Sequence, residues 1–266
     1  MTITASTPRA AESTHWYTRD GIPRYTIIGA NGKERNTTLR DARKEGLVPS
    51  VTTILKVAAN PVLNQWIQKQ VLMAALTLPK VEGESSDEYI ARIMNDSKQQ
   101  GKDAADRGTE IHNAVQSFYE GKSDSTYVEH RKGCVKALQG VYGDVVWISE
   151  RAFGHEMGFG GKCDLHSPQG DGIVVDIKTK DYQEGDKLEV YNSHAMQVAA
   201  YRVGLGLPKA RCGIVYVSRT VPGLAKVIEL DEEEISKSWL MFYNLLRYWC
   251  LSNNYEPFQT ISESDK

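Results

Sequence analysis

The chain has 266 residues and a mass of 29.7 kDa, with 41% hydrophobic residues, 25% charged residues and a formal net charge of −2. These values match ordinary globular domains and argue against a disordered chain or one that coats nucleic acid non-specifically. No stretch approaches the roughly 18 consecutive apolar residues of a membrane span, so no membrane association is expected.

The first half of the chain is predicted to be mainly helical. Residues 1–20 are expected to form a flexible arm, and residues 24–39 a β-hairpin around Asn31 and Gly32, a pair typical of tight turns. Four helices are expected: from a cap at Asn60 and a first turn at Pro61 to Leu76, from Ser85 or Ser86 to Gly101, over residues 103–120 with Gly121 ending the helix, and over residues 128–141.

After Tyr142 the hydrophobic period becomes that of strands. Strands are expected over residues 145–153, 158–166 and 171–180, a helix over 193–203, strands over 211–218 and 225–230, and a final helix over 232–251. This order predicts an α/β protein with a β-β-β-α-β core. Residues 21–142 are expected to be a hairpin and helical region that forms one structural unit with the core at 143–266.

Cysteines and the N-terminus bear on metal chemistry and on compartment. The four cysteines are widely spaced, which argues against a zinc ribbon or a sequence-local iron-sulfur site and favours reduced, buried thiols. Residues 1–15 contain no apolar segment of a secretion signal and make a poor transit peptide. A cytoplasmic protein is therefore expected.

The charges are unevenly distributed along the second half. Residues 202–226 contain five basic residues and no acidic one, whereas residues 229–266 contain eight acidic and three basic residues. Such a block can hold a phosphate backbone locally, but it is equally typical of an ordinary solvated surface.

A pair of neighbouring strands carries the main chemical signal. Asp176 and Lys178 lie two apart in a strand and therefore share a face. Asp164 and Asp176 are equidistant from Gly170, so a regular hairpin would bring the two carboxylates opposite each other, with Lys162 facing Lys178. Facing carboxylates are unfavourable unless a cation such as Mg²⁺ or Mn²⁺ joins them. The alternative is a cross-strand cluster of salt bridges.

Three further side chains have candidate roles. His112 borders the apolar stripe of its helix four residues after Gly108, a glycine that suggests close approach of another group. A satisfied boundary histidine is the alternative to a metal ligand. Gln197 and Tyr201 share a helix face and can orient such a site or contact a phosphate, although the pair taken alone favours a structural role.

As a set, these residues resemble the PD-(D/E)XK nuclease superfamily, in particular its RecB-like exonuclease branch. The matching segments, in order, are RGTEIH at residues 107–112, Glu150, GGKCD at 160–164, DIKTK at 176–180 and QVAAY at 197–201. The segment PSVTTIL at 49–55 is similar to the N-terminal part of the mitochondrial genome maintenance exonuclease and related phage enzymes. The resemblance implies a restriction-endonuclease-like core, a mixed sheet flanked by helices, with an N-terminal helical extension.

The resemblance also implies roles for individual residues. His112, Asp164, Asp176 and the Ile177 carbonyl would bind one or two Mg²⁺ or Mn²⁺ ions, and Glu150 would be an outer or second-metal ligand. Lys178 would position or activate the attacking water, so the implied catalytic residues are Asp164, Asp176, Lys178 and Glu150. Residues that would support the site or contact DNA are Gln197, Tyr201, Lys162, Lys180, Arg107, Ser50 and Thr52. Some relatives hold an iron-sulfur cluster, but the cysteine spacing here does not reproduce theirs, and none is expected.

The implied function is a metal-dependent DNA nuclease, in particular an exonuclease acting on single-stranded DNA or DNA ends in repair, recombination or phage replication. A bacterial or phage-infected cell is the expected setting rather than a mitochondrion, and no protein partner is indicated. No helicase-type phosphate loop occurs, so the nuclease would be self-standing. Because the ligands must be deprotonated, activity is expected to rise toward mildly alkaline pH. Two alternatives stay open, a non-catalytic nucleic-acid-binding protein on a nuclease scaffold and a small-molecule phosphohydrolase on another fold.

Overall fold

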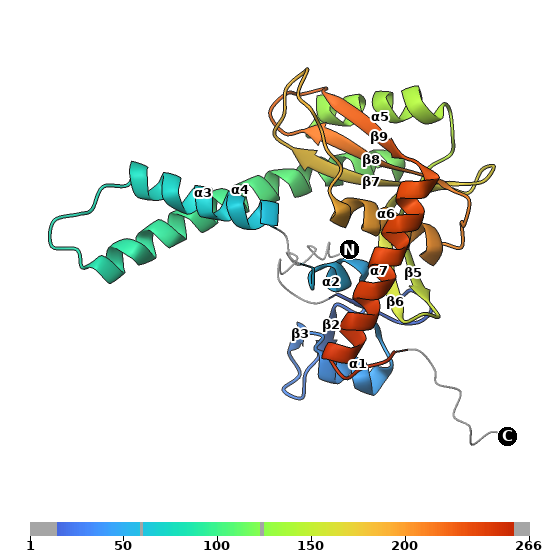
Figure 1. Cartoon of the computed structure of the whole chain (residues 1–266), viewed down its shortest axis with the longest axis horizontal. Coiled ribbons are helices and arrows are strands. Elements are labelled where there is room, and N and C mark those ends of the chain that lie inside the picture. Colours follow the sequence, from blue (N-terminus) through green and yellow to red (C-terminus); the bar gives the residue numbers. More distant parts are fainter. Residues whose placement is uncertain (1–14, 59–60, 123–124, 258–266) are drawn as a thin grey trace, which may run out of the picture.

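The computed structural model describes residues 15–58, 61–122 and 125–257. A five-stranded mixed sheet with helices on both faces forms its centre (Figure 1), so the predicted α/β class is confirmed. The strands, in spatial order, are β5 (Ile148–His155), β6 (Phe159–Ser167), β7 (Ile173–Lys180), β8 (Arg211–Ser218) and β9 (Ala225–Leu230). β7 and β8 run parallel, and the other neighbours run antiparallel.

The step from β7 to the parallel β8 needs a crossover, which α6 (Asn192–Gly204) supplies. The β-β-β-α-β order is therefore present, and β8 and β9 have the predicted bounds. β5 begins later and ends later than the predicted 145–153. The apolar side chains of Val145 and Trp147 misled the prediction, because they pack on the core from the segment that precedes the strand.

Two apolar cores hold the helices to the sheet. α5 (Val128–Tyr142) and the C-terminal part of α4 (Ser86–Tyr119) pack on one face through buried residues that include Ile111 and Leu138. α6, α7 (Glu232–Ser252) and α2 (Val51–Leu55) pack on the other. Each fully buried aliphatic or aromatic side chain contributes about 1.5–3 kcal/mol, so both cores fix the strands that carry the site.

α4 is one continuous helix of 34 residues, which corrects the prediction of two helices broken at Gly101. It begins at Ser86, within the predicted start, and Ser85 caps it: the Ser85 hydroxyl accepts from the Glu88 amide, and the Glu88 side chain accepts from the Ser85 amide. A glycine within a helix costs only about 1 kcal/mol, less than the loss of the hydrogen bonds around a break. Gly101 also faces the Trp66 indole, 3.5 Å from where a Cβ would lie.

The N-terminal segment lies against the sheet. β1 (Trp16–Tyr17) pairs with β4 (Val48–Pro49), and Trp16 is only 1% exposed, so the expected flexible arm over residues 1–20 is wrong from residue 16 on. The hairpin around Asn31 is confirmed as β2 (Thr26–Ile28) and β3 (Glu34–Asn36). The prediction missed α1 (Leu39–Glu45), although the capping box of Thr38 and Asp41 marks its start.

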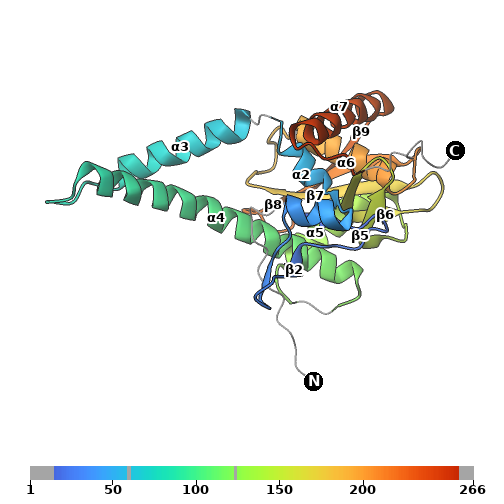
Figure 2. The same cartoon turned by 90° about the horizontal axis from the view of Figure 1, so that it is seen from below.

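α3 (Pro61–Thr77) and the first half of α4 form a helical hairpin that projects from the body in two orthogonal views (Figures 1 and 2). The predicted helix to Leu76 is confirmed, whereas its predicted cap, Asn60, lies outside the described residues. In the described ranges, no helix is long and apolar enough to cross a membrane.

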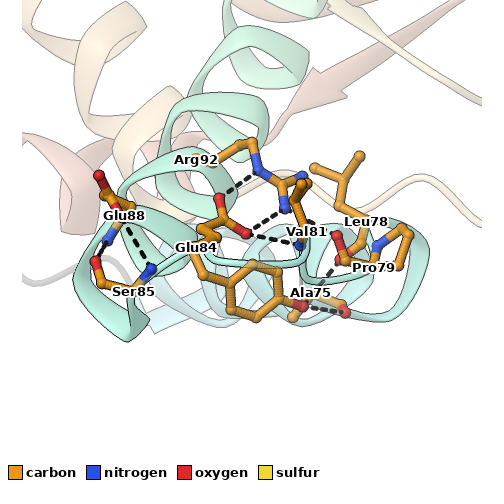
Figure 3. Close-up of polar contacts among 9 residues, drawn as sticks. Ala75, Leu78, Pro79, Val81, Glu84, Ser85, Glu88 and Arg92 are labelled. Atoms are coloured by element: carbon orange, nitrogen blue, oxygen red, sulfur yellow. Dashed lines mark hydrogen bonds and ion pairs between the residues drawn. The ribbon is translucent and has the colours of Figure 1, made fainter.

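Polar contacts stabilise the turn between α3 and α4 (Figure 3). The Arg92 guanidinium donates to both carboxylate oxygens of Glu84 and to the Pro79 carbonyl. The Tyr89 hydroxyl donates to the carbonyls of Ala75 and Leu78 at the end of α3. These contacts join the two helices at the tip of the hairpin.

Candidate active site

β6 and β7 separate where the predicted carboxylates lie. Their ladder covers only Leu165 to Ser167 against Val175 to Ile173, although both strands continue past it. Cys163 and Leu165, two apart, pack into different cores, so β6 rotates between them at Asp164. The register agrees with the predicted position of Asp164 relative to Asp176, but the two strands fork there instead of forming a regular hairpin.

Asp164 lies at the base of this fork. One carboxylate oxygen, Oδ2, accepts a hydrogen bond of 2.8 Å from the Ile177 amide, and the other lies 3.2 Å from His112 Nε2 on α4. Burial by itself would raise the pKa of this carboxyl. The charges of His112 and Lys178 and the hydrogen bonds from His112 and the Ile177 amide outweigh burial and lower the pKa, so Asp164 is held as a carboxylate.

Asp176 is the most deeply buried charged group of the site, with its side chain only 1% exposed. Its Oδ2 lies 2.7 Å from Lys178 Nζ as an ion pair, but among the described residues no donor in hydrogen-bonding geometry reaches either oxygen. Burial raises the pKa of Asp176, and the nearby charge of Asp164 adds to this, against the opposing effect of Lys178. The carboxylate is therefore costly to bury as it stands.

Lys178 is held from two sides. Besides its contact with Asp176, its ammonium donates a 3.0 Å hydrogen bond to Gln197 Oε1 on α6. Gln197 in turn donates to the Tyr201 hydroxyl at 2.8 Å. Burial would lower the pKa of Lys178, but the two aspartates outweigh it and raise the pKa, so the ammonium stays charged. Gln197 and Tyr201 thus support Lys178 from α6.

Glu150 and Lys162 form an ion pair across β5 and β6. The β6–β7 ladder ends at Leu165 and Val175, so Lys162 is not paired with Lys178, which corrects the expectation that the two face each other. On its other side Lys162 is opposite Ala152 of β5. Glu150 has a positive φ of 54°, rare for a residue with a side chain, and the β5–β6 ladder skips it. Backbone strain of this kind costs about 1–3 kcal/mol and often occurs at functional sites.

Among the described residues, His112, Glu150 and Asp164 lie close enough together for one cation. One ligand atom from each lies within 4.8 Å of the other two. This set differs from the predicted one, because Glu150 takes the place of Asp176, whose carboxylate contacts Lys178 instead. The Ile177 amide points into the fork toward Asp164, and the carbonyl of the same strand residue projects from the same edge.

A cavity of about 230 Å³ brings most of the predicted residues together. Its lining includes His112, Glu150, Lys162, Asp164, Asp176, Ile177, Lys178, Gln197, Tyr201, Ser50 and Thr52. Arg107 and Lys180 do not line it: Arg107 is exposed on α4, and Lys180 lies over the Tyr191 ring, 5.5 Å from its centroid. The geometry supports a site for these residues except Arg107 and Lys180.

No protein-family model and no curated protein matches this sequence. Among solved structures, the chain is similar to one described as "Crystal structure of SSO0001", at 18% identity and a TM-score of 0.31. The alignment covers 77% of this chain and 98% of that chain. A likeness of this strength indicates neither the fold nor the function of this chain.

Gly108 has a packing explanation. A Cβ there would lie 2.5 Å from the Thr179 hydroxyl of β7, so the glycine lets α4 approach the strand beside His112. A second cavity of about 280 Å³ follows this contact and shares His112, Ile177 and Lys178 with the first. The two cavities therefore meet at the imidazole and the ammonium.

The uneven charge distribution is explained largely by pairing between segments. Arg202 pairs with Glu232 and Arg211 with Glu229, which joins the basic segment to the acidic one. Arg219 pairs with Asp181 and lines the second cavity. These ion pairs make the basic block mainly part of the fold, and only Arg219 of the three lies beside the site.

The sequence reasoning missed an aromatic wall of the first cavity. His15, Tyr17 and Tyr25 line it, although the N-terminal segment was expected to be an arm and a plain hairpin. The available signal was the run of aromatic residues from His15 to Tyr17, which is unusual in a solvated arm. Nothing in that run indicates which element it faces, because the partner is distant in sequence.

Proposed function

We propose that this chain is a metal-dependent deoxyribonuclease of the PD-(D/E)XK superfamily, RecB-like branch, that hydrolyses phosphodiester bonds of single-stranded DNA or DNA ends. One observation carries the proposal: two aspartates, a lysine and a histidine from β6, β7 and α4 converge on one cavity. The β-β-β-α-β order, with the site at the fork of β6 and β7, supports a restriction-endonuclease-like core.

The donor set fits Mg²⁺ or Mn²⁺. The ligand atoms of His112, Glu150 and Asp164 lie close enough to hold one ion, which Asp176 and the Ile177 carbonyl would join, and oxygen ligands with one imidazole suit these cations. Among the described residues the buried Asp176 carboxylate is paired with the Lys178 ammonium at Oδ2, while its Oδ1 has no hydrogen-bond donor, a cost that a cation would lower. A bound ion would supply charge neutralisation at the phosphate and a lower pKa for the attacking water.

The residues of the chain have separable tasks in this proposal. Lys178 presents a fixed positive charge to the phosphate, and because Asp176 and Gln197 hold its ammonium, it needs little reorientation during reaction. The Ile177 amide and His112 orient Asp164. Tyr201 orients Gln197, and through it Lys178, from α6.

The test is digestion of end-labelled single- and double-stranded DNA with Mg²⁺, with Mn²⁺ and with EDTA. We expect cutting only with metal, and a loss of about 10²–10³-fold in Lys178→Ala, the usual effect of removing a preorganised charge. Lys180→Ala is the matched control, since it removes the same charge from the same strand outside the cavity. Binding of DNA without cutting would support a non-catalytic scaffold instead, and product ladders from each labelled end would give the polarity.

A further inference from the structure

The wall of the first cavity that comes from the N-terminal segment is aromatic. The His15 and Tyr25 rings are stacked, with centroids 4.5 Å apart and planes inclined by 30°. Tyr17 lies edge-on to Tyr25 at 5.6 Å, and the two hydroxyls are 2.5 Å apart. All three residues line the cavity that also contains Asp164 and Lys178.

Hydrogen bonds fix the backbone that carries these rings. The Ser50 amide donates to the His15 carbonyl at 2.9 Å, and the His15 amide contacts the Thr53 hydroxyl at 3.2 Å. The Thr37 amide donates to the Tyr25 carbonyl at 2.9 Å. The wall is therefore tied both to the start of α2 and to the end of β3.

Glycines of the sheet allow this close approach. A Cβ at Gly160 of β6 would lie 2.9 Å from the Tyr17 side chain, and one at Gly154 of β5 would lie 2.4 Å from the Arg19 carbonyl. A parallel bridge joins Ser50 to Gly160. The aromatic wall is thus built against the same strand that carries Asp164, and it keeps a set position relative to the site.

Burial indicates which rings of this segment have a structural role and which can contact a ligand. Trp16, between His15 and Tyr17, is buried in the core against Trp249 and Tyr255. His15 and Tyr25 are only partly buried, and they border the cavity. A stacked pair beside a cationic group is a surface that suits a flat aromatic ligand with a phosphate attached.

We propose that the His15–Tyr25 pair is a stacking platform for one unpaired nucleobase next to the phosphate at Lys178, and that it favours single-stranded DNA. The inference rests on the proposed nuclease function and names residues that select its substrate. In a double helix each base is already stacked and paired, so it cannot turn to such a wall without local opening. In this proposal the bound DNA strand continues past Lys178 into the second cavity, which shares His112 and Lys178 with the first.

The experiment uses labelled single-stranded oligodeoxynucleotides with one abasic position, moved stepwise relative to the cut, and Mn²⁺ as the cation. For the unchanged protein we expect one abasic position beside the cut to raise KM by roughly 5- to 100-fold, as loss of a stacked base does. Tyr25→Leu should raise KM for the intact oligonucleotide similarly and should remove the abasic penalty. Tyr25→Phe keeps the ring, so KM for the intact oligonucleotide and the abasic penalty should both stay within about twofold of those of the unchanged protein.

The outcomes are distinguishable from a failure of the nuclease proposal. Cutting of intact DNA with no penalty at any abasic position overturns the platform and leaves the nuclease standing. No cutting by the unchanged protein with either cation overturns both. If Tyr25→Leu does not fold, His15→Leu takes its place, and the abasic series on the unchanged protein decides the question without any variant.

Discussion

The fork of β6 and β7 and the α3–α4 hairpin differ in where their charged and apolar groups lie. At the fork, Asp176 is buried, Asp164 and Lys178 are partly buried, and these groups are contacted from β6, β7, α4 and α6. On the hairpin, large apolar side chains are exposed, with Leu72 at 65% and Leu76 at 82%. Polar contacts at the fork are shielded from water, whereas those at the tip compete with it.

The difference indicates where substitutions should matter. A buried polar group that loses its partner costs more than one that water can solvate. Changes at the fork are therefore expected to affect activity and stability together, and changes on the hairpin to have small, local effects. The following substitutions test that contrast.

Asp164→Asn should have the largest effect. It removes a charge that the Ile177 amide and His112 stabilise, so we expect cutting to fall by at least about 10²-fold. Stability should fall by about 1–2 kcal/mol, because a neutral acceptor replaces a charged one. The measurements are single-turnover digestion and urea unfolding. The control is Asp181→Asn, which removes a more exposed carboxylate paired with Arg219 and should change neither the cutting rate nor the stability by much. Equal losses in the two variants would contradict the difference between buried and exposed charges.

Two glycines seven residues apart on α4 form the next comparison. Ala at Gly108 would place its Cβ 2.5 Å from the Thr179 hydroxyl, so Gly108→Ala should destabilise by about 1–3 kcal/mol and displace His112. Ala at Gly101 meets the Trp66 indole at an ordinary 3.5 Å, so Gly101→Ala should stabilise by up to about 1 kcal/mol. The measurements are thermal unfolding and DNA digestion of both glycine variants. Destabilisation of similar size in both would refute the proposed contact of α4 with β7.

His194, in the first turn of α6, should make the stability of the folded protein depend on pH. Burial first, and then the charges of Lys178 and Lys180, lower its pKa to about 3, from about 6.5 in the unfolded chain. The unfolded state therefore takes up the proton first. This contribution to stability is complete above pH 6.5 and is lost as pH falls toward 3, by up to about 1.4 kcal/mol per pH unit.

His194→Gln should reduce the loss of stability between pH 6.5 and 3, because glutamine does not titrate. The Gln amide can still contact the Tyr216 hydroxyl, which lies 3.0 Å from His194 Nδ1. The measurement is urea unfolding of both proteins at a series of pH values between 3 and 7. Parallel curves for the two proteins would show that His194 is not the group responsible.

Arg92→Ala at the hairpin tip should have the smallest effect. It removes the contacts with Glu84 and the Pro79 carbonyl, which lie at a partly exposed turn, so we expect a loss of at most about 1 kcal/mol and unchanged cutting. Faster amide hydrogen exchange confined to residues 75–92 would report the loosened tip. A large loss of DNA cutting would instead tie the hairpin to the site.

Much of the fold follows from local patterns in the sequence. The order of strands and helices after Tyr142 was predicted because buried strands and amphipathic helices have distinct periods. The single helix α4 was missed because a glycine is a weak local signal, and packing against Trp66 and Thr179 overrides it. The buried strand β1 was missed because its partner, β4, lies about 30 residues away, and sequence proximity does not reveal such pairs.

The candidate site divides in the same way. Strand alternation places Asp176 and Lys178 on a common face, and helical spacing does the same for Gln197 and Tyr201, so these pairs could be found from the sequence. The position of Asp164 relative to Asp176 followed from the register. The rotation of β6 at Asp164, the pairing of Lys162 with Glu150 and the aromatic wall depend on contacts between distant segments. These features require the folded chain.

The most direct test of the proposed metal-dependent site is anomalous X-ray scattering from crystals soaked in Mn²⁺, compared for the unchanged protein and Asp164→Asn. We expect a manganese peak within coordination distance of Asp164 and His112, and its loss in the variant. A protein that cuts DNA with Mn²⁺ while its manganese lies elsewhere, in both forms, would contradict the assignment of the active site to this fork.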